Sequence, residues 1–501
     1  METFILALDQ GTSSTRSLLV DRQGNIVAMA QQELPQIYPQ AAWVEHDAHL
    51  IWQHQLSTIK AVIEQAKISV KQISAIGITN QRETTVVWNK KTGQAISNAI
   101  VWQDRRTQAY CQELKEAGHI AMVQDKTGLL LDPYFSGTKL RWLLQNVPGA
   151  KALAQAGELA FGTIDAWLIW NLSQGQHHVT DTSNASRSLL WNLKQACWDS
   201  ELLDLFEIPN SVLPQVLPSN SFFGKTHMDV LGHAIPIMGV AGDQQAALFG
   251  QNCWQAGTAK NTYGTGCFLL MHTGSQIVRS QHQLLSTAAA SHNSQLQYAL
   301  EGSVFMAGAT IQWLRDGLGI IESSHQVEAL ATSVPNNGGV HLVPAFTGLG
   351  APYWDANAKA AIMGLSRGSH KAHIARAALE SIALQTTALV NAMNQDAVQS
   401  GGQVLSQLKV DGGASANSFL MQFQADLLGV PVLRPKITES TAMGAAYLAG
   451  LGAGIWQNTQ ELQQYWQLDR CFEPVMSRDQ AQQALHDWDK AVQQVRCHSL
   501  L

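Results

Sequence analysis

The sequence is poor in charge and in cysteine, and each shortage excludes a class of protein. Charged residues make up 14% of the 501 residues, and the net charge of −6 provides no positive surface for nucleic acids or anionic membranes. The six cysteines are scattered, and none forms a C-x-x-C pair. That usage is typical of reduced thiols in a cytoplasmic protein. We therefore expect no nucleic-acid partner and no disulfide framework.

A secretory signal and a membrane span are also absent from the pattern. The first ten residues carry the acids Glu2 and Asp9 and no basic residue. An uncharged stretch at 441–459 is rich in alanine and glycine but includes Gln457 and Asn458. This composition favours a buried helix over a membrane span. The sequence predicts a cytoplasmic protein with no membrane insertion.

A Walker-type phosphate loop is missing as well. The nearest match ends at Gly224, Lys225 and Thr226, but Ser219 stands at the leading glycine position. Two phenylalanines follow it where a phosphate cradle needs small residues. Any binding of nucleotide phosphates must therefore use another kind of turn.

What the chain has in quantity is apolar residues, 46% of the total, and 39 glycines. This composition indicates a globular, loop-rich chain with a large buried core. A length of 501 residues exceeds what one hydrophobic core usually supports. We expect at least two domains.

The first informative motif is a small-residue turn between two apolar runs. The run 4–8 ends at Asp9, and the turn 10–15 (Gln-Gly-Thr-Ser-Ser-Thr) leads into the run 18–20. This pattern predicts a β-hairpin. Its turn would present N–H groups and hydroxyls to an anion, beside a carboxylate able to hold a divalent cation. That combination suits nucleotide phosphates with Mg²⁺, and an ordinary hairpin is the alternative.

Polar residues also follow two later strands. The predicted strand 73–78 ends close to Arg82 and Glu83, and another strand ends at Asp243 and Gln244. Open α/β sheets bind ligands at strand ends. Arg82 and Glu83 would offer donors and acceptors to a polyhydroxylated substrate, and Asp243 could accept a proton. A solvated turn and simple helix capping by Asp243 are the alternatives.

The glycine-bearing turns recur in the second half of the chain. Residues 260–271 repeat the opening pattern, with Thr265 in the turn, and 411–413 (Asp-Gly-Gly) precede a predicted helix at 418–428. A helix N-terminus behind a glycine pair favours a phosphate or a purine edge. The recurrence predicts a duplicated fold whose second half starts near residue 250.

Two longer segments, 134–146 and 360–380, match the signatures of one family. With them the chain resembles the FGGY carbohydrate kinase family over nearly its whole length. Segments 80–85 and 242–245 resemble the members that act on glycerol rather than on a pentose. The resemblance implies the α/β, two-domain, actin/hexokinase-like (ribonuclease H-like) ATPase fold with an interdomain cleft. Residues 1-250 would bind glycerol and phosphate, and residues 251-501 would bind the nucleotide.

The resemblance also implies roles for individual residues. Those that would bind glycerol are Arg82, Glu83, Trp102, Tyr134, Asp243, Gln244 and Phe268. Those that would bind ATP or ADP are Thr12, Ser13, Ser14, Arg16, Thr265, Gly308, Gln312, Gly413 and Asn417. Asp9 and Asp243 would face Mg²⁺, and Asp243 would act as the catalytic base.

The implied reaction is the Mg²⁺-dependent transfer of a phosphoryl group from ATP to glycerol, giving sn-glycerol 3-phosphate in glycerol catabolism. The expected enzyme is an ATP:glycerol 3-phosphotransferase that forms a homo-oligomer, a dimer or tetramer. Two alternatives stay open. One is a kinase for another polyol or a ketose, and the other is a non-catalytic, ATP-dependent clamp or sensor on the actin-like fold.

Two regulatory features of the family are not matched. Some bacterial members bind fructose 1,6-bisphosphate through a glycine-rich loop and an arginine before an Ile-Pro pair. Here Ala234 takes the arginine position, and 227–233 reads His-Met-Asp-Val-Leu-Gly-His. The segment that docks the sugar phosphotransferase protein in enteric members is replaced by 473–481. We therefore expect fructose 1,6-bisphosphate to have almost no effect.

Overall fold

The computed structural model describes residues 3–292, 295–355 and 357–498, which divide into two compact α/β units. The first unit comprises Met1–Asn252, Ser286–Tyr298 and Glu439–Trp466. The second comprises Cys253–Leu285, Ala299–Thr438 and Gln467–Leu501. The expected boundary after residue 250 divides the chain into two continuous halves, whereas the compact units are discontinuous along the chain. A two-domain α/β fold was expected, and the structure has one.

The first unit is built on a six-stranded sheet with the order β13-β14-β5-β1-β2-β3. An antiparallel meander, β1 (Phe4–Gln10), β2 (Ser14–Val20) and β3 (Ile26–Glu33), contains the predicted hairpin. On the other side of β1, the strands β5 (Ile73–Asn80) and β14 (Pro236–Gly242) add in parallel. The polar residues that follow β1, β5 and β14 therefore come from the same edge of one sheet.

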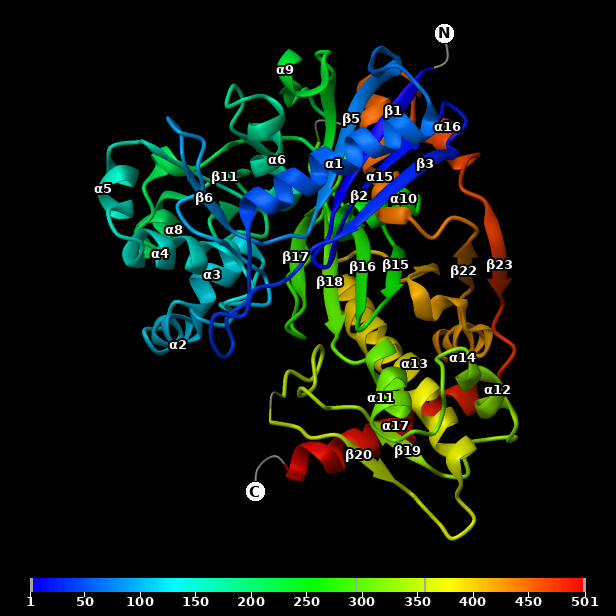
Figure 1. The fold of residues 1–501 in the computed structure, drawn as a ribbon. Coiled ribbons are helices and arrows are strands. Elements are labelled where there is room, and N and C mark those ends of the chain that lie inside the picture. Colours follow the sequence, from blue (N-terminus) through cyan, green and yellow to red (C-terminus); the bar gives the residue numbers. More distant parts are fainter. Residues whose placement is uncertain (1–2, 293–294, 356, 499–501) are drawn as a thin grey trace. The chain divides into compact units, whose positions relative to one another are not determined.

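Helices cover this sheet, which is why its central strands are almost continuously apolar. The helix α1 (Ala48–Ala66) packs against β2 and β3 (Figure 1). The helix α15 (Ser440–Gly452) packs against β1, β5 and β14. It has the Ala- and Gly-rich sequence for which a buried helix was predicted, and residues 442–450 are all buried.

Small residues allow α15 to approach its neighbours closely. A Cβ added at Gly77 of β5 would lie 2.1 Å from the carbonyl oxygen of Ala445. One added at Gly444 would lie 1.8 Å from the carbonyl oxygen of Ala246, on α10 (Asp243–Gly250). Contacts this short are incompatible with any larger residue, so these glycines fix how α15 sits on the sheet.

The remaining elements of the first unit are mostly short. They are β4 (Glu45–His46), η1 (Val70–Gln72), β6 (Val86–Asn89), β7 (Ala99–Ile100), α2 (Gln108–Glu116), α3 (Ile120–Thr127), α4 (Ser136–Asn146), α5 (Ala150–Gln155), β8 (Leu159–Gly162), α6 (Ile164–Leu172), β9 (Val179–Asp181), α7 (Thr182–Ala185), β10 (Trp191–Asn192), β11 (Cys197–Trp198), α8 (Ser200–Leu205), η2 (Asn210–Val212), β12 (Gln215–Leu217), β13 (Gly224–Lys225), α9 (Met228–Leu231) and α16 (Thr459–Gln463).

A seven-stranded sheet has the order β17-β18-β16-β15-β21-β22-β23, and its last five strands lie wholly in the second unit. There β15 (Thr258–Tyr263) and β16 (Cys267–Gly274) form an antiparallel hairpin. The strands β21 (Gln407–Asp411) and β22 (Val432–Pro435) follow β15 in parallel. Both sheets thus contain a hairpin followed by two parallel strands, as the recurring turns predicted.

The longest helix of the second unit is α13 (Lys371–Gln399), and it packs against α12 (Gln326–Thr332) and α14 (Ser418–Leu428). The other elements in this part of the chain are β17 (Leu285–Ala289), β18 (Gln297–Val304), α11 (Gly308–Asp316), α12 (Gln326–Thr332), β19 (His341–Val343), β20 (Ala361–Met363), η3 (Gly413–Ala416), α14 (Ser418–Leu428), β23 (Leu468–Phe472) and α17 (Arg478–His498).

Each unit has its own hydrophobic core. Five of the six cysteines have described side chains, and each of the five is a free thiol. Within the described ranges, every helix is too short or too polar to cross a membrane.

Candidate active site

The β1–β2 hairpin carries an ionic cluster at its turn. Asp9 and Arg16 are register partners, and Arg16 Nη2 lies 2.9 Å from Asp9 Oδ2. The other terminal nitrogen of Arg16 lies 2.5 Å from Glu439 Oε2, just before α15. Burial raises the pKa of Asp9 to about 6, an effect that Arg16 opposes and the charges of Glu439 and Asp243 strengthen. Glu439 was not anticipated from the sequence.

The turn itself is tied to its surroundings by hydrogen bonds. Trp102 donates from Nε1 to Thr12 Oγ1 at 2.9 Å. Leu34 donates its backbone N–H to the carbonyl of Ser13, while the Ser13 residue is exposed. The Ser14 carbonyl accepts from Gly11 N across the turn. The three expected hydroxyl residues therefore lie on one ordered, partly exposed turn beside Asp9 and Arg16.

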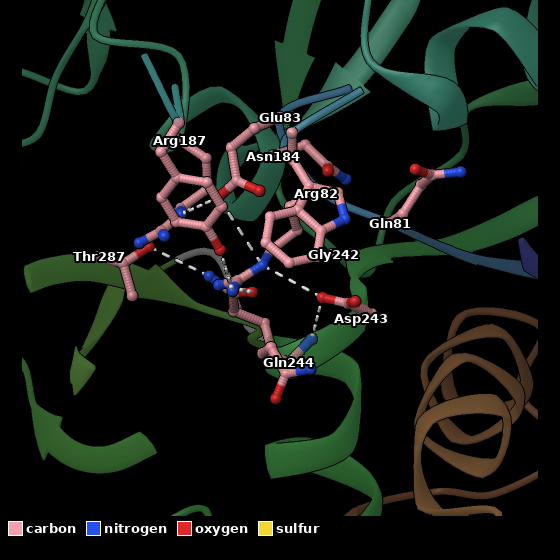
Figure 2. A network of polar contacts seen from close by, with 12 residues as sticks. Gln81, Arg82, Glu83, Asn184, Arg187, Gly242, Asp243, Gln244 and Thr287 are labelled. Atoms are coloured by element: carbon pink, nitrogen blue, oxygen red, sulfur yellow. Dashed lines mark hydrogen bonds and ion pairs between the residues drawn. The ribbon is translucent and has the colours of Figure 1, made fainter. Parts of the chain in front are cut away.

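Arg82 lies at the centre of a buried polar network (Figure 2). Its side chain is 2% exposed, and its Nε lies 3.1 Å from Asp243 Oδ1. The terminal nitrogens donate to Gln245 Oε1 at 3.2 Å and to the Tyr134 hydroxyl at 3.4 Å. A Cβ at Gly242 would lie 2.6 Å from Arg82 Cγ, so the glycine before Asp243 makes room for the arginine.

Glu83 has a closer ionic partner than its sequence neighbour Arg82. Its Oε1 lies 3.9 Å from Arg82 Nε but only 2.6 Å from the Nε of Arg187 (Figure 2). Its backbone has a φ of 60°, a conformation that non-glycine residues adopt rarely and at a cost. The hydroxyls of Thr85 and Ser136 each donate to its carbonyl at 3.0 Å, which helps hold this conformation.

Asp243 is the first residue of α10, and the N-cap position belongs to Gly242. Its Oδ1 accepts from the N–H of Gln244, the second helical residue, at 2.7 Å, but it does so from the first helical position and not from the N-cap position. The side chain is 31% exposed, unlike the buried Arg82 beside it. Simple capping therefore does not account for Asp243, whose carboxylate can reach a ligand.

Aromatic rings lie beside this network. Trp102 and Tyr134 meet edge to face, with ring centroids 5.5 Å apart. The Lys139 ammonium group donates to the carbonyl oxygens of Tyr134 and Phe135 at 2.5 and 3.0 Å, and burial lowers its pKa to about 8. Lys139 thus fixes the backbone that presents the Tyr134 hydroxyl to Arg82. Contacts within the first unit link Arg82, Glu83, Trp102, Tyr134, Asp243 and Gln244.

A segment that was not singled out in the sequence, 181–188, contacts the residues beside Asp243 and Arg82 and pairs with Glu83. Asp181 caps α7 by accepting from the N–H groups of Ser183 and Asn184. Ser183 Oγ accepts from Gly242 N at 2.9 Å, next to Asp243. The side-chain amides of Asn184 and Asn80 pair reciprocally, just before Arg82. The available signal was a run of small polar residues around one arginine, Asp-Thr-Ser-Asn-Ala-Ser-Arg-Ser at 181–188.

The remaining expected residues lie on the second unit. Gly308 donates its N–H to the carbonyl of Gly264, and Ala309 donates to that of Thr265, so the β15–β16 turn adjoins the start of α11. Around Gly413 there is open space, and Asn417 caps α14 by accepting from Leu420 N. Gln312 is exposed on α11, and Phe268 is half-buried on β16.

Family models match most of the chain. The N-terminal domain of the FGGY family of carbohydrate kinases matches residues 4–250, and the C-terminal domain of the same family matches residues 259–453.

Individual relatives align with this chain over nearly its full length. The chain is 60% identical to a glycerol kinase of Polaromonas sp. (strain JS666 / ATCC BAA-500) and to one of Delftia acidovorans (strain DSM 14801 / SPH-1), each alignment covering 98% of this chain and 99% of the relative. Among solved structures, Plasmodium falciparum glycerol kinase with ADP is 35% identical, with a TM-score of 0.94 over 99% of this chain and 98% of that one. A xylulose kinase from Lactobacillus acidophilus shares the fold, with a TM-score of 0.88 at 23% identity over 98% of this chain and 97% of that one. The chain belongs to the FGGY family of carbohydrate kinases.

Proposed function

We propose that this protein transfers the γ-phosphoryl group of ATP to glycerol, giving sn-glycerol 3-phosphate and ADP. The observation that carries the proposal is the cluster of Arg82, Glu83 and Asp243 at the strand ends of the first unit, next to the Trp102 and Tyr134 rings. It offers charged donors and acceptors to hydroxyls and an aromatic surface to a short carbon chain. The 60% identity to glycerol kinases over 98% of the chain supports the same substrate.

Asp243 has the surroundings of a general base for this reaction. Its partly exposed carboxylate would accept the proton as the terminal hydroxyl attacks the γ-phosphorus. Arg82 Nε at 3.1 Å and Gln244 N at 2.7 Å orient the carboxylate before substrate arrives. Arg16 and the hydroxyls of the β1–β2 turn would stabilise charge on the phosphoryl oxygens, since phosphoryl transfer depends mainly on positioning and electrostatics.

The residues present fit a magnesium ion. Asp9 Oδ2 is buried without a hydrogen-bonding partner, although Arg16 lies 2.9 Å away as an ion pair. The charge of Asp243 contributes to raising the pKa of Asp9. Mg²⁺ is typically held by one or two carboxylates together with substrate phosphates. We propose that Asp9 and Asp243 hold this ion, which would neutralise phosphate charge.

Two other activities are weaker candidates. A kinase for a pentulose would share the fold, but the xylulose kinase from Lactobacillus acidophilus is only 23% identical. A non-catalytic clamp or sensor on the actin-like fold would not require an oriented carboxylate such as Asp243 beside a buried arginine. The arrangement of Arg82 and Asp243 therefore favours an enzyme.

A substrate panel tests the proposal. The purified protein is incubated with ATP, Mg²⁺ and one of glycerol, dihydroxyacetone, xylulose or gluconate, and ADP formation is followed. We expect glycerol to have the highest kcat/KM by at least about tenfold, because a site fitted to a small triol gives a larger sugar no matching contacts. An equal or higher value for xylulose would support the pentulose kinase. ATP hydrolysis without phosphorylation of any acceptor would support the clamp.

A further inference from the structure

The proposed mechanism leaves one buried arginine unexplained. Arg187 follows α7, its side chain is 0% exposed, and its Nε lies 2.6 Å from Glu83 Oε1. Its guanidinium carbon lies 5.5 Å from the centroid of the Tyr134 ring and 5.1 Å from that of Phe135. We propose that Arg187 is a positioning and specificity-determining residue, which keeps Glu83 as an ionised, oriented acceptor for one substrate hydroxyl. This inference rests on the proposed function.

Glu83 needs such a partner because of where it lies. The residue is 1% exposed, and its left-handed backbone conformation has to be held by its surroundings. A buried carboxylate that loses its positive partner tends to take up a proton. It would then present a hydroxyl donor as well as an acceptor, and it would no longer select for a hydroxyl donor from the substrate. Arg187 therefore determines the hydrogen-bonding character of Glu83.

Arg82 is the more distant ionic partner of Glu83 and cannot fully replace Arg187. Its Nε is 3.9 Å from Glu83, and the guanidinium group already contacts Asp243, Gln245 and Tyr134. Arg82 lies 3.1 Å from Asp243 and 3.9 Å from Glu83, whereas Arg187 lies 2.6 Å from Glu83, so Arg187 is the closer partner of Glu83 (Figure 2). Loss of Arg187 should therefore affect hydroxyl recognition through Glu83 and leave the base and its arginine in place.

The consequence concerns selection among small polyols. A diol that lacks the hydroxyl facing Glu83 leaves an ionised, buried acceptor without its donor, which penalises the diol relative to glycerol. Without Arg187, Glu83 keeps only the more distant arginine, Arg82 at 3.9 Å, so its ionised form is held less firmly and the missing hydroxyl matters less. The ratio of kcat/KM for glycerol to that for the disfavoured diol should then fall.

The experiment compares Arg187→Gln and Arg187→Lys with the wild type, using glycerol, 1,2-propanediol and 1,3-propanediol. We expect Arg187→Gln to raise the KM for glycerol about 10- to 100-fold and to reduce discrimination against at least one diol about tenfold. The KM for ATP should stay within about twofold, because Arg187 acts through Glu83. Arg187→Lys should recover part of the discrimination, since it keeps the charge but loses the planar guanidinium contact.

Two further comparisons distinguish positioning from structural support. In a Glu83→Gln background, Arg187→Gln should cause no further loss of discrimination, because the two residues act as a pair. The matched control is Arg141→Gln. Arg141 also has a glutamate partner, Glu207 at 2.7 Å, and an aromatic ring at 3.8 Å, on the same unit but outside the polar network. It should leave the KM for glycerol and the discrimination within about twofold of wild type.

The inference is overturned if Arg187→Gln lowers kcat/KM equally for glycerol and both diols, or if its effect on discrimination persists in the Glu83→Gln background. Should Arg187→Gln fail to fold, Arg187→Lys carries the same test: unchanged discrimination in a folded lysine variant overturns the inference, and partial loss supports it. A wild type that phosphorylates none of the three alcohols overturns the proposed function and this inference with it. A wild type active on glycerol, with discrimination unaffected by either substitution, overturns the inference alone.

Discussion

Two aspartates at strand ends of the same sheet have very different surroundings. Asp9 has a side chain 3% exposed beside Arg16, whereas that of Asp243 is 31% exposed and oriented by Arg82 and Gln244 N. A buried carboxylate oxygen without a hydrogen-bonding partner, as in Asp9, can be satisfied by a bound cation, and a partly exposed carboxylate can accept a proton from a substrate. The difference in burial supports assigning different roles to the two residues.

The first residue-scale prediction concerns the proposed base. Asp243→Asn keeps the shape of the side chain but removes proton acceptance, so kcat should fall roughly 10²- to 10⁴-fold or more. Glycerol binding, measured by calorimetry, should change much less than kcat. The control Asp204→Asn changes an exposed aspartate on α8 of the same unit and should leave kcat near that of wild type. Near-normal turnover in Asp243→Asn would show that another group accepts the proton.

The second residue-scale prediction concerns pH and Asp9. Its pKa in the folded protein is about 6, above the ordinary value of 3.8, so the folded state holds the proton more tightly. The stabilisation due to that proton is complete below the ordinary value and is lost as pH rises through about 6. Asn at this position does not titrate. The stability of wild type relative to Asp9→Asn should therefore fall by about 1–1.5 kcal/mol between about pH 5 and about pH 7.5.

Thermal denaturation of both proteins at the two pH values measures this difference. Asp229→Asn serves as the control, because Asp229 has a side chain 75% exposed and should show no comparable trend. A difference in Tm between wild type and Asp9→Asn that is constant with pH would contradict the prediction.

At the residue scale, sequence reasoning succeeded where a residue follows a strand and failed where its partner is distant in the chain. Asp9, Arg82 and Asp243 follow recognisable strands. Arg187 pairs with Glu83 across 104 positions, and Glu439 pairs with Arg16 across 423. Nothing in the local pattern reveals such partners, because folding alone brings them together.

At the scale of elements, helices with one apolar face were predicted well. The segment 418–428 was expected as a helix, and α14 has those bounds. The helix α13 begins after His370, which caps its start. Short elements such as α7 were missed, because four residues give no periodicity to detect.

At the scale of elements, the close contact between α15 and α10 predicts the effect of enlarging Gly444. The α15 helix lies against α10, whose first residue is Asp243, and Gly444 meets Ala246 with no space for a methyl group. Gly444→Ala should therefore separate the two helices and destabilise the protein by about 1–3 kcal/mol or more, despite the better helix propensity of alanine. It should also lower kcat by displacing Asp243.

Urea denaturation and glycerol-dependent activity of Gly444→Ala test this packing argument. Gly368→Ala is the matched control, because its Cβ would meet only Ser366 Oγ at 3.8 Å. That substitution should change stability by less than about 0.5 kcal/mol. If Gly444→Ala were as stable and active as Gly368→Ala, close approach of α15 would not be what aligns α10.

At the scale of the whole molecule, the duplicated sheet was predictable and the division of the chain was less so. The hairpin-and-strand pattern repeats in both halves, and both sheets have it. The segment Glu439–Trp466 belongs to the first unit although it comes late in the chain. Its alanine and glycine content indicated a buried helix but not which sheet would bury it. The pattern of apolar residues in a segment indicates that the segment is buried. Which sheet it packs against depends on the complete fold.

Regulation of the whole enzyme gives the last prediction, which concerns fructose 1,6-bisphosphate. A bisphosphate site needs clustered positive charge or converging backbone N–H groups. The segment from His227 to Pro236 has neither arginine nor lysine, and its Asp229 side chain is 75% exposed. The N–H of Asp229 is taken by His227 Nδ1, and that of Gly232 by the Met228 carbonyl, so these donors serve α9 itself.

Just before this segment in the sequence stands Lys225, and a single exposed lysine binds phosphate weakly at physiological salt. Millimolar fructose 1,6-bisphosphate should therefore leave glycerol phosphorylation within about 10–20% of its value with an equal ionic strength of sulfate. Ala234→Arg restores the missing charge and should increase any inhibition that exists. Saturating inhibition of the wild type at low effector concentration, unchanged by Ala234→Arg, would place the effector site elsewhere on the molecule.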